Sequence, residues 1–131
     1  MNREPNLLDH MQNEVRKLNI NKGWREPDGS SLTTFGEYVA LLHSEVSEIL
    51  EAFRDYRLDP HTTENLESNG IIGKPDDVGS EFADVFIRLL DMADIFGIDL
   101  TYEYKRKMAY NWTRRYRHGG RTLSPGHEMP F

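Results

Sequence analysis

Residues 80 to 100 read SEFADVFIRLLDMADIFGIDL, and residues 43 to 55 read HSEVSEILEAFRD. Apolar residues recur at three- and four-residue spacings in and around both stretches, a pattern typical of a helix with one buried face. The expected buried positions are Val39, Leu42, Val46, Ile49, Leu50 and Phe53 in one helix and Phe82, Val85, Phe86, Leu89, Leu90, Ala93 and Phe96 in the other.

The ends of these two helices carry sequence signals. Thr34 followed by Glu37 is typical of a capping box, so the first helix is expected to begin there and continue to about residue 56. The second is expected to begin within residues 77 to 80 and to end at Gly97, a C′ glycine. Residues 57 to 79 contain several glycines and prolines, which predict a long connection.

Two further helical patterns flank this pair, at about residues 6 to 19 and from a cap at Asp99 to about residue 116. No segment shows sustained strand-like alternation. The sequence therefore predicts an all-α fold, with one domain over residues 1 to 120 and an irregular tail over residues 121 to 131. A chain of 131 residues is long enough for one domain and short for two.

Composition narrows the classes of function. The absence of cysteine excludes disulfides, zinc–thiolate sites and thiol catalysis. No apolar run approaches the roughly 20 residues of a membrane span, and no signal peptide is visible, so we expect a cytoplasmic protein with no membrane partner. The net charge of −6 is uneven, because residues 105 to 131 hold seven bases against Glu128. An acidic body with a basic C-terminal segment is suited to binding metal and phosphate together.

Two pairs of carboxylates are the main functional signal. Glu45 and Glu48 are three residues apart on one helix, and Glu81 and Asp84 on the next. Side chains at i and i+3 have Cβ atoms roughly 5–6 Å apart, so each pair can converge on one point. Relative to the apolar centres expected on the two helices, the four acids lie about 100° to 160° around the helix axes, off the core.

Four carboxylates held together repel one another unless a cation is present. Mg²⁺ is the expected occupant, with Mn²⁺ as a substitute, because it prefers oxygen ligands and keeps waters and substrate phosphates in its shell. The alternative is that these acids are exposed to solvent and bind nothing. We interpret four other acidic residues of the two helices in that way: Glu51, Asp55, Asp91 and Asp94. A di-iron carboxylate bundle requires Glu-x-x-His pairs, and none of the five histidines follows a glutamate at that spacing.

The ordered E-x-x-E and E-x-x-D pairs, together with KMAYNWTRRYRHGG at residues 107 to 120, resemble the MazG-like family of all-α nucleoside triphosphate pyrophosphohydrolases. The similarity covers about residues 34 to 120. It implies a four-helix bundle completed by dimerisation, as a homodimer or a dimer of dimers. Ser44 departs from the pattern, since many members carry a second acid there; this affects the number of metals and the choice of base.

The resemblance also implies a reaction and a ligand set. The reaction is hydrolysis of the phosphoric anhydride of an NTP or dNTP to the monophosphate and pyrophosphate, for nucleotide house-cleaning or control of a dNTP pool. The metal ligands are Glu45, Glu48, Glu81 and Asp84. Of these, Glu48 and Glu45 are the candidate catalytic residues, and we expect Glu48 to accept the attacking water's proton, either directly or from the second coordination shell.

Substrate contacts are expected from two other segments. Lys107, Asn111 and Arg114 follow one another at i, i+4 and i+7, which predicts a stripe that binds phosphate oxygens. Its alternative is a solvated basic row near a helix C-terminus. Trp24, with Asn19 nearby in sequence, is the candidate for stacking on the base and for edge contacts; the alternative is that Trp24 fastens its loop to the bundle.

Three competing functions differ from catalysis: a nucleotide sensor of the same fold, a helical interaction module, and nucleic-acid binding through residues 105 to 121. The acidic body disfavours a nucleic-acid polymer.

Overall fold

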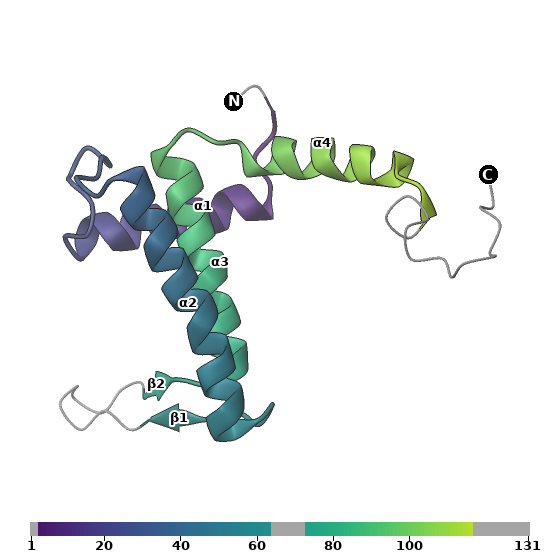
Figure 1. Ribbon diagram of the computed structural model, residues 1–131. Helices are drawn as coiled ribbons and strands as arrows, with labels where there is room; N and C mark the ends of the chain where they lie inside the picture. Colours follow the sequence, from purple (N-terminus) through teal and green to yellow (C-terminus); the bar gives the residue numbers. More distant parts are fainter. Residues whose placement is uncertain (1–2, 64–72, 117–131) are drawn as a thin grey trace, which may run out of the picture. The chain divides into compact units, whose positions relative to one another are not determined.

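The computed structural model describes residues 3–63 and 73–116, and the chain in these ranges is predominantly α-helical (Figure 1). Four helices are described: α1 (Leu7–Asn21), α2 (Phe35–Tyr56), α3 (Val78–Ile95) and α4 (Leu100–Thr113). The all-α prediction is therefore confirmed. Within these residues, no helix is both long and apolar enough to cross a membrane.

The chain divides into two compact units, Met1–Ile98 and Asp99–Phe131. The first unit contains α1, α2 and α3, and the second contains α4. The domain expected over residues 1 to 120 spans both units. The expected tail at residues 121 to 131 lies outside the described residues.

The predicted caps are present at the helix ends. Thr34 Oγ1 accepts from the Glu37 backbone N–H at 3.2 Å, and the Thr34 N–H donates to Glu37 Oε2 at 3.1 Å, which forms the expected capping box. Asp77 caps α3 through the Ser80 N–H, and Gly97 follows that helix with a φ of 69°. Only α4 is shorter than expected, since it ends at Thr113.

In the first unit, α2 and α3 lie side by side and antiparallel, and α1 packs against α3 (Figure 1). Buried and half-buried positions recur along α2 at spacings of four and three residues, among them Tyr38, Leu42, Glu45, Ile49 and Ala52. On α3, Glu81, Val85 and Arg88 are half-buried at similar spacings, and the run from Leu90 to Ala93 is fully buried. The seam between the helices therefore contains charged side chains at its middle and apolar ones on either side.

The apolar centres expected for the two helices are wrong. Val46 and Phe86 are both exposed, because each helix turns a neighbouring face toward the other. Exposed apolar side chains continue along both helices at three- and four-residue spacings: Val46, Leu50 and Phe53 on α2, and Phe82, Phe86 and Leu89 on α3. By helical angle, these residues lie on the face of the α2–α3 pair opposite the four carboxylates.

A short two-stranded element lies at the end of α2 and the beginning of α3 (Figure 1). β1 (Thr62–Thr63) pairs antiparallel with β2 (Lys74–Pro75). Asp76 fastens this element to α2: it accepts hydrogen bonds from the Tyr56 and Thr63 hydroxyls and pairs with His61 Nδ1 at 2.6 Å. The sequence pattern did not predict these strands, which contain only two residues each.

The opposite end of the α2–α3 pair is closed by the loop between α1 and α2. Arg25 is buried, and its guanidinium Nη1 lies 2.9 Å from Asp94 and 3.3 Å from Asp91, both on α3. Its Nε donates to the Gly29 carbonyl at 2.7 Å. Asp91 is also buried, so its interpretation as an exposed acid is wrong: a carboxylate among Leu90, Met92 and Ala93 requires a cation partner.

We expect Arg25→Met to lower the free energy of unfolding by about 3 kcal/mol, because Asp91 would then be buried without a compensating charge. Urea denaturation followed by circular dichroism measures the change. The control is Arg106→Met, which breaks an exposed pair with Glu103 and should cost under about 1 kcal/mol. Equal losses in the two variants would contradict the structural role given to Arg25.

Candidate metal centre

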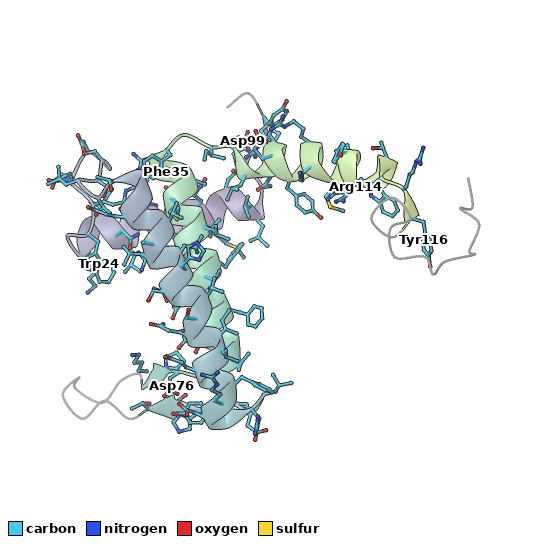
Figure 2. All side chains as sticks on the ribbon, in the orientation of Figure 1. Trp24, Phe35, Asp76, Asp99, Arg114 and Tyr116 are labelled. Atoms are coloured by element: carbon cyan, nitrogen blue, oxygen red, sulfur yellow. The ribbon has the colours of Figure 1, made fainter. Side chains whose placement is uncertain are left out.

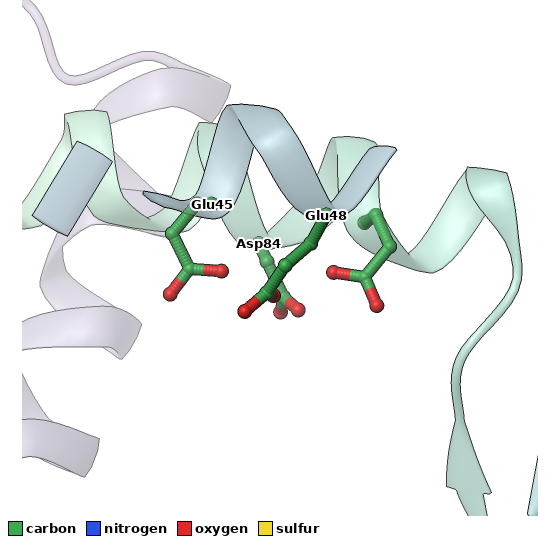
Figure 3. A group of neighbouring side chains, drawn as sticks. Glu45, Glu48 and Asp84 are labelled. Carbon is green, nitrogen blue, oxygen red and sulfur yellow. The ribbon is translucent and has the colours of Figure 1, made fainter. Parts of the chain in front are cut away.

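The four predicted carboxylates converge at the middle of the α2–α3 pair. Each of Glu45, Glu48, Glu81 and Asp84 offers an oxygen within 4.8 Å of the others. Figure 3 shows the carboxylates of Glu45, Glu48 and Asp84 directed to the same side of the two helices. The i, i+3 spacing on each helix and the antiparallel packing of the helices together account for this convergence.

Burial differs among the four. Glu45, Glu48 and Glu81 are half-buried, and Asp84 is exposed. The Oε2 atom of Glu81 is buried and has no hydrogen-bond partner among the described residues. A buried carboxylate oxygen without a donor is unfavourable, and a bound cation would satisfy it.

Crowding changes the protonation of two of the acids. Burial, followed by the negative charges of Asp84 and Glu48, raises the pKa of Glu81 to about 7. Burial, and then the charge of Glu45, also raises the pKa of Glu48. In both cases, the carboxylate is less stable than it would be in water, because its neighbours are negative and its solvation is incomplete. The cluster therefore favours either protons or a cation.

Arg88 is the one cation bonded directly to this cluster among the described residues. Its Nη2 donates to Glu45 Oε1 at 2.9 Å. Arg88 was not among the predicted site residues, although it lies four residues after Asp84 and seven after Glu81, on the same face of α3.

A pocket of about 460 Å³ adjoins the carboxylates within the first unit. Glu45, Asp84 and Arg88 line one part of it, and Asn19 of α1 and Trp24 of the following loop line another. Trp24 projects from that loop (Figure 2) and is 68% exposed, so it does not fasten the loop by burial. Both residues predicted to contact a base thus border the same pocket as two predicted metal ligands.

The predicted phosphate-binding row lies in the second unit. Lys107 and Asn111 are exposed on α4, and Lys107 Nζ lies 5.5 Å from the centroid of the Tyr110 ring. Arg114 is the C-cap residue and has extended backbone angles. Lys107 and Asn111 therefore lie within α4, whereas Arg114 follows the end of the helix at Thr113 (Figure 2).

Oxygen ligands of this kind suit Mg²⁺ or Mn²⁺, because both are hard cations that bind carboxylates and retain water. The buried, unpartnered oxygen of Glu81 and the raised pKa values fit a cation among the four side chains. The arrangement could hold a metal at the entrance of a pocket that has both apolar and polar walls.

Comparison of the chain with protein-family models, with curated proteins and with solved structures finds no match.

The raised pKa of Glu81 predicts a pH dependence of stability in the metal-free protein. Its value is about 7 in the folded chain and 4.5 ordinarily, so the folded state loses stability as pH rises from about 4.5 to 7. Glu81→Gln removes this loss, and we expect it to raise the free energy of unfolding by about 1–3 kcal/mol at pH 8 and by only about a quarter as much at pH 5.

Urea denaturation in EDTA at the two pH values measures this difference. Glu51→Gln is the matched control, because Glu51 is an exposed glutamate of α2 outside the cluster. A gain from Glu81→Gln that is the same at both pH values would show that crowding of charge is not its cause.

Proposed function

We propose that this chain is a Mg²⁺-dependent hydrolase that converts a nucleoside or deoxynucleoside triphosphate to the monophosphate and pyrophosphate, with a MazG-like fold. The observation that carries the proposal is the convergence of Glu45, Glu48, Glu81 and Asp84 within 4.8 Å beside a pocket. The E-x-x-E and E-x-x-D order of these acids in the sequence supports the same family.

The pocket is suited to a nucleoside next to the cluster. Its volume of about 460 Å³ lies in the range of small-molecule sites. The Trp24 ring offers a stacking surface, the Asn19 amide offers a donor and an acceptor for a base edge, and Leu18, Leu41 and Ile87 supply apolar walls. With a base at Trp24, the phosphates of the same molecule would extend toward Glu45 and Asp84.

The reaction breaks the anhydride bond between the α- and β-phosphoryl groups with water as the nucleophile. Mg²⁺ bound by the four carboxylates would neutralise charge on phosphate oxygens and would lower the pKa of a water molecule. Glu48 accepts the proton of the attacking water; burial and the charge of Glu45 raise its pKa, which makes its carboxylate a stronger base. Glu45, Glu48, Glu81 and Asp84 would hold the cation, and Lys107, Asn111 and Arg114 are proposed to bind phosphate oxygens.

Product analysis tests the reaction. The protein is incubated with Mg²⁺ and each common NTP and dNTP, and the products are separated by ion-exchange chromatography. We expect monophosphate and pyrophosphate, and in H₂¹⁸O the label identifies which phosphorus is attacked. Diphosphate with orthophosphate would place the cleavage elsewhere. Nucleotide binding without turnover would instead favour a sensor.

Substitution of the ligands tests the site. Glu45→Gln and Asp84→Asn should each reduce kcat at least a hundredfold, because each removes a negative ligand while keeping the shape of the side chain. Glu51→Gln should retain activity. Near-normal turnover in either of the first two variants, with an unchanged circular dichroism spectrum, would overturn the assignment of the centre.

We also propose that the chain forms a homodimer or a dimer of dimers through the exposed apolar face of α2 and α3. Val46, Leu50 and Phe86 belong to this face, and single monomers seldom expose large contiguous apolar surface. A second copy on this face would leave the opposite, carboxylate-bearing face open to substrate.

Leu50→Arg should therefore shift the protein from oligomer to monomer, since an arginine would have to be desolvated at the interface. Sedimentation velocity measures the mass. Leu32→Arg is the matched control, because Leu32 is 89% exposed in the loop before α2 and lies outside the face. An unchanged mass for Leu50→Arg would remove this face as the interface.

A further inference from the structure

Arg88 lies where the carboxylate cluster meets the pocket. It extends from the face of α3 that carries Glu81 and Asp84, and it lines the pocket together with Asp84 and Glu45. Its ion pair with Glu45 joins α3 to α2, with a distance of 2.9 Å between Nη2 and Oε1. The pair is partly exposed, with 28% of the arginine side chain accessible to solvent. Arg88 is therefore a partly exposed residue in the lining of the pocket.

Arg88 also has unused hydrogen-bonding capacity. A guanidinium carries five N–H donors in a planar fork, and among the described residues only the Nη2 of Arg88 has a partner. Arg25 differs, since it is buried and its Nε and Nη1 are engaged by Gly29, Asp91 and Asp94. Within the described lining of the pocket, Arg88 is thus the cation positioned to meet an incoming anion.

The ion pair with Glu45 competes with metal binding. A guanidinium on Glu45 neutralises part of the charge that attracts a cation, and it engages an oxygen that a cation would use as a ligand. When a cation takes Glu45, the guanidinium loses its partner and needs another anion nearby. A polyphosphate beside the cluster supplies oxygens that the planar fork can bind in pairs.

We propose that Arg88 is a positioning residue with two alternative partners, Glu45 when no cation is bound and a polyphosphate oxygen when cation and substrate are both present. The inference rests on the proposed function, because it takes the four carboxylates as a cation site. It makes Arg88 a source of coupling between the two ligands. Arg88 weakens binding of the cation alone and strengthens binding of polyphosphate to the cation-loaded protein, and such coupling is reciprocal.

Arg88→Met tests this by two binding measurements that do not depend on turnover. Mn²⁺ alone is titrated and followed by electron paramagnetic resonance, and inorganic tripolyphosphate is titrated calorimetrically at saturating Mn²⁺. Because a hydrogen bond between charged groups contributes roughly a factor of ten, we expect Mn²⁺ to bind about tenfold more tightly to the variant. Tripolyphosphate should bind about tenfold more weakly.

Two further variants make the result specific. Arg88→Lys keeps the positive charge but loses the fork, so Mn²⁺ affinity should remain close to that of the unchanged protein while tripolyphosphate affinity falls. Arg106→Met removes an arginine from an exposed pair and should change neither affinity. Melting temperatures of all variants verify that the fold is intact.

The outcomes separate the inference from the proposed function. Unchanged or weaker Mn²⁺ binding by Arg88→Met overturns the competition at Glu45, and unchanged tripolyphosphate binding overturns the second partner. If the unchanged protein binds no Mn²⁺, the cation site itself is wrong, and the proposed function fails with it.

Discussion

Mutual repulsion of four carboxylates along one helix–helix seam, three of them half-buried, is the constraint on which the rest of this structure depends. Glu45, Glu48 and Glu81 occupy half-buried positions that a stable pair of helices would ordinarily fill with apolar side chains. The pair tolerates them because apolar residues such as Ile49 and Leu90 pack on either side, and because Arg88 bonds to Glu45. The Oε2 atom of Glu81 stays buried without a hydrogen-bond partner among the described residues, so the cost of crowding is concentrated at this side chain.

Sequence periodicity predicted local structure well because helix caps and amphipathic spacing are local properties. The capping box at Thr34 and the glycine after α3 are examples. It failed at the question of which face is buried, because α2 and α3 each carry two adjacent apolar stripes and only packing decides between them. Val46 was therefore placed in a core that it does not enter. The angular positions of apolar residues around a single helix cannot distinguish a face that packs on another helix from one that packs on a second molecule.

Some residues of the candidate site were likewise predictable from local sequence, and others were not. Its acids could be found from spacing alone, since i and i+3 positions are neighbours on any helix. The partners that come from distant segments could not. Arg25 is separated from Asp91 by 66 residues, and Glu45 from Arg88 by 43, and no rule of helical periodicity connects them. The need of Asp91 for a cation partner became evident only from the structure, in which it lies in a run of buried residues.

The anchoring of the α1–α2 loop has a consequence for altering this protein. Trp24 and Arg25 are sequence neighbours with opposite surroundings, the first exposed to the pocket and the second bonded to α3. Replacing Trp24 changes a wall of the pocket and leaves the bonds between the loop and α3 intact. Replacing Arg25 breaks those bonds and frees the loop, and with it the part of the pocket wall that Trp24 forms. Libraries for redirected ligand preference should therefore randomise position 24 and keep position 25 fixed. Position 24 can accept different side chains only as long as Arg25 holds the loop in place.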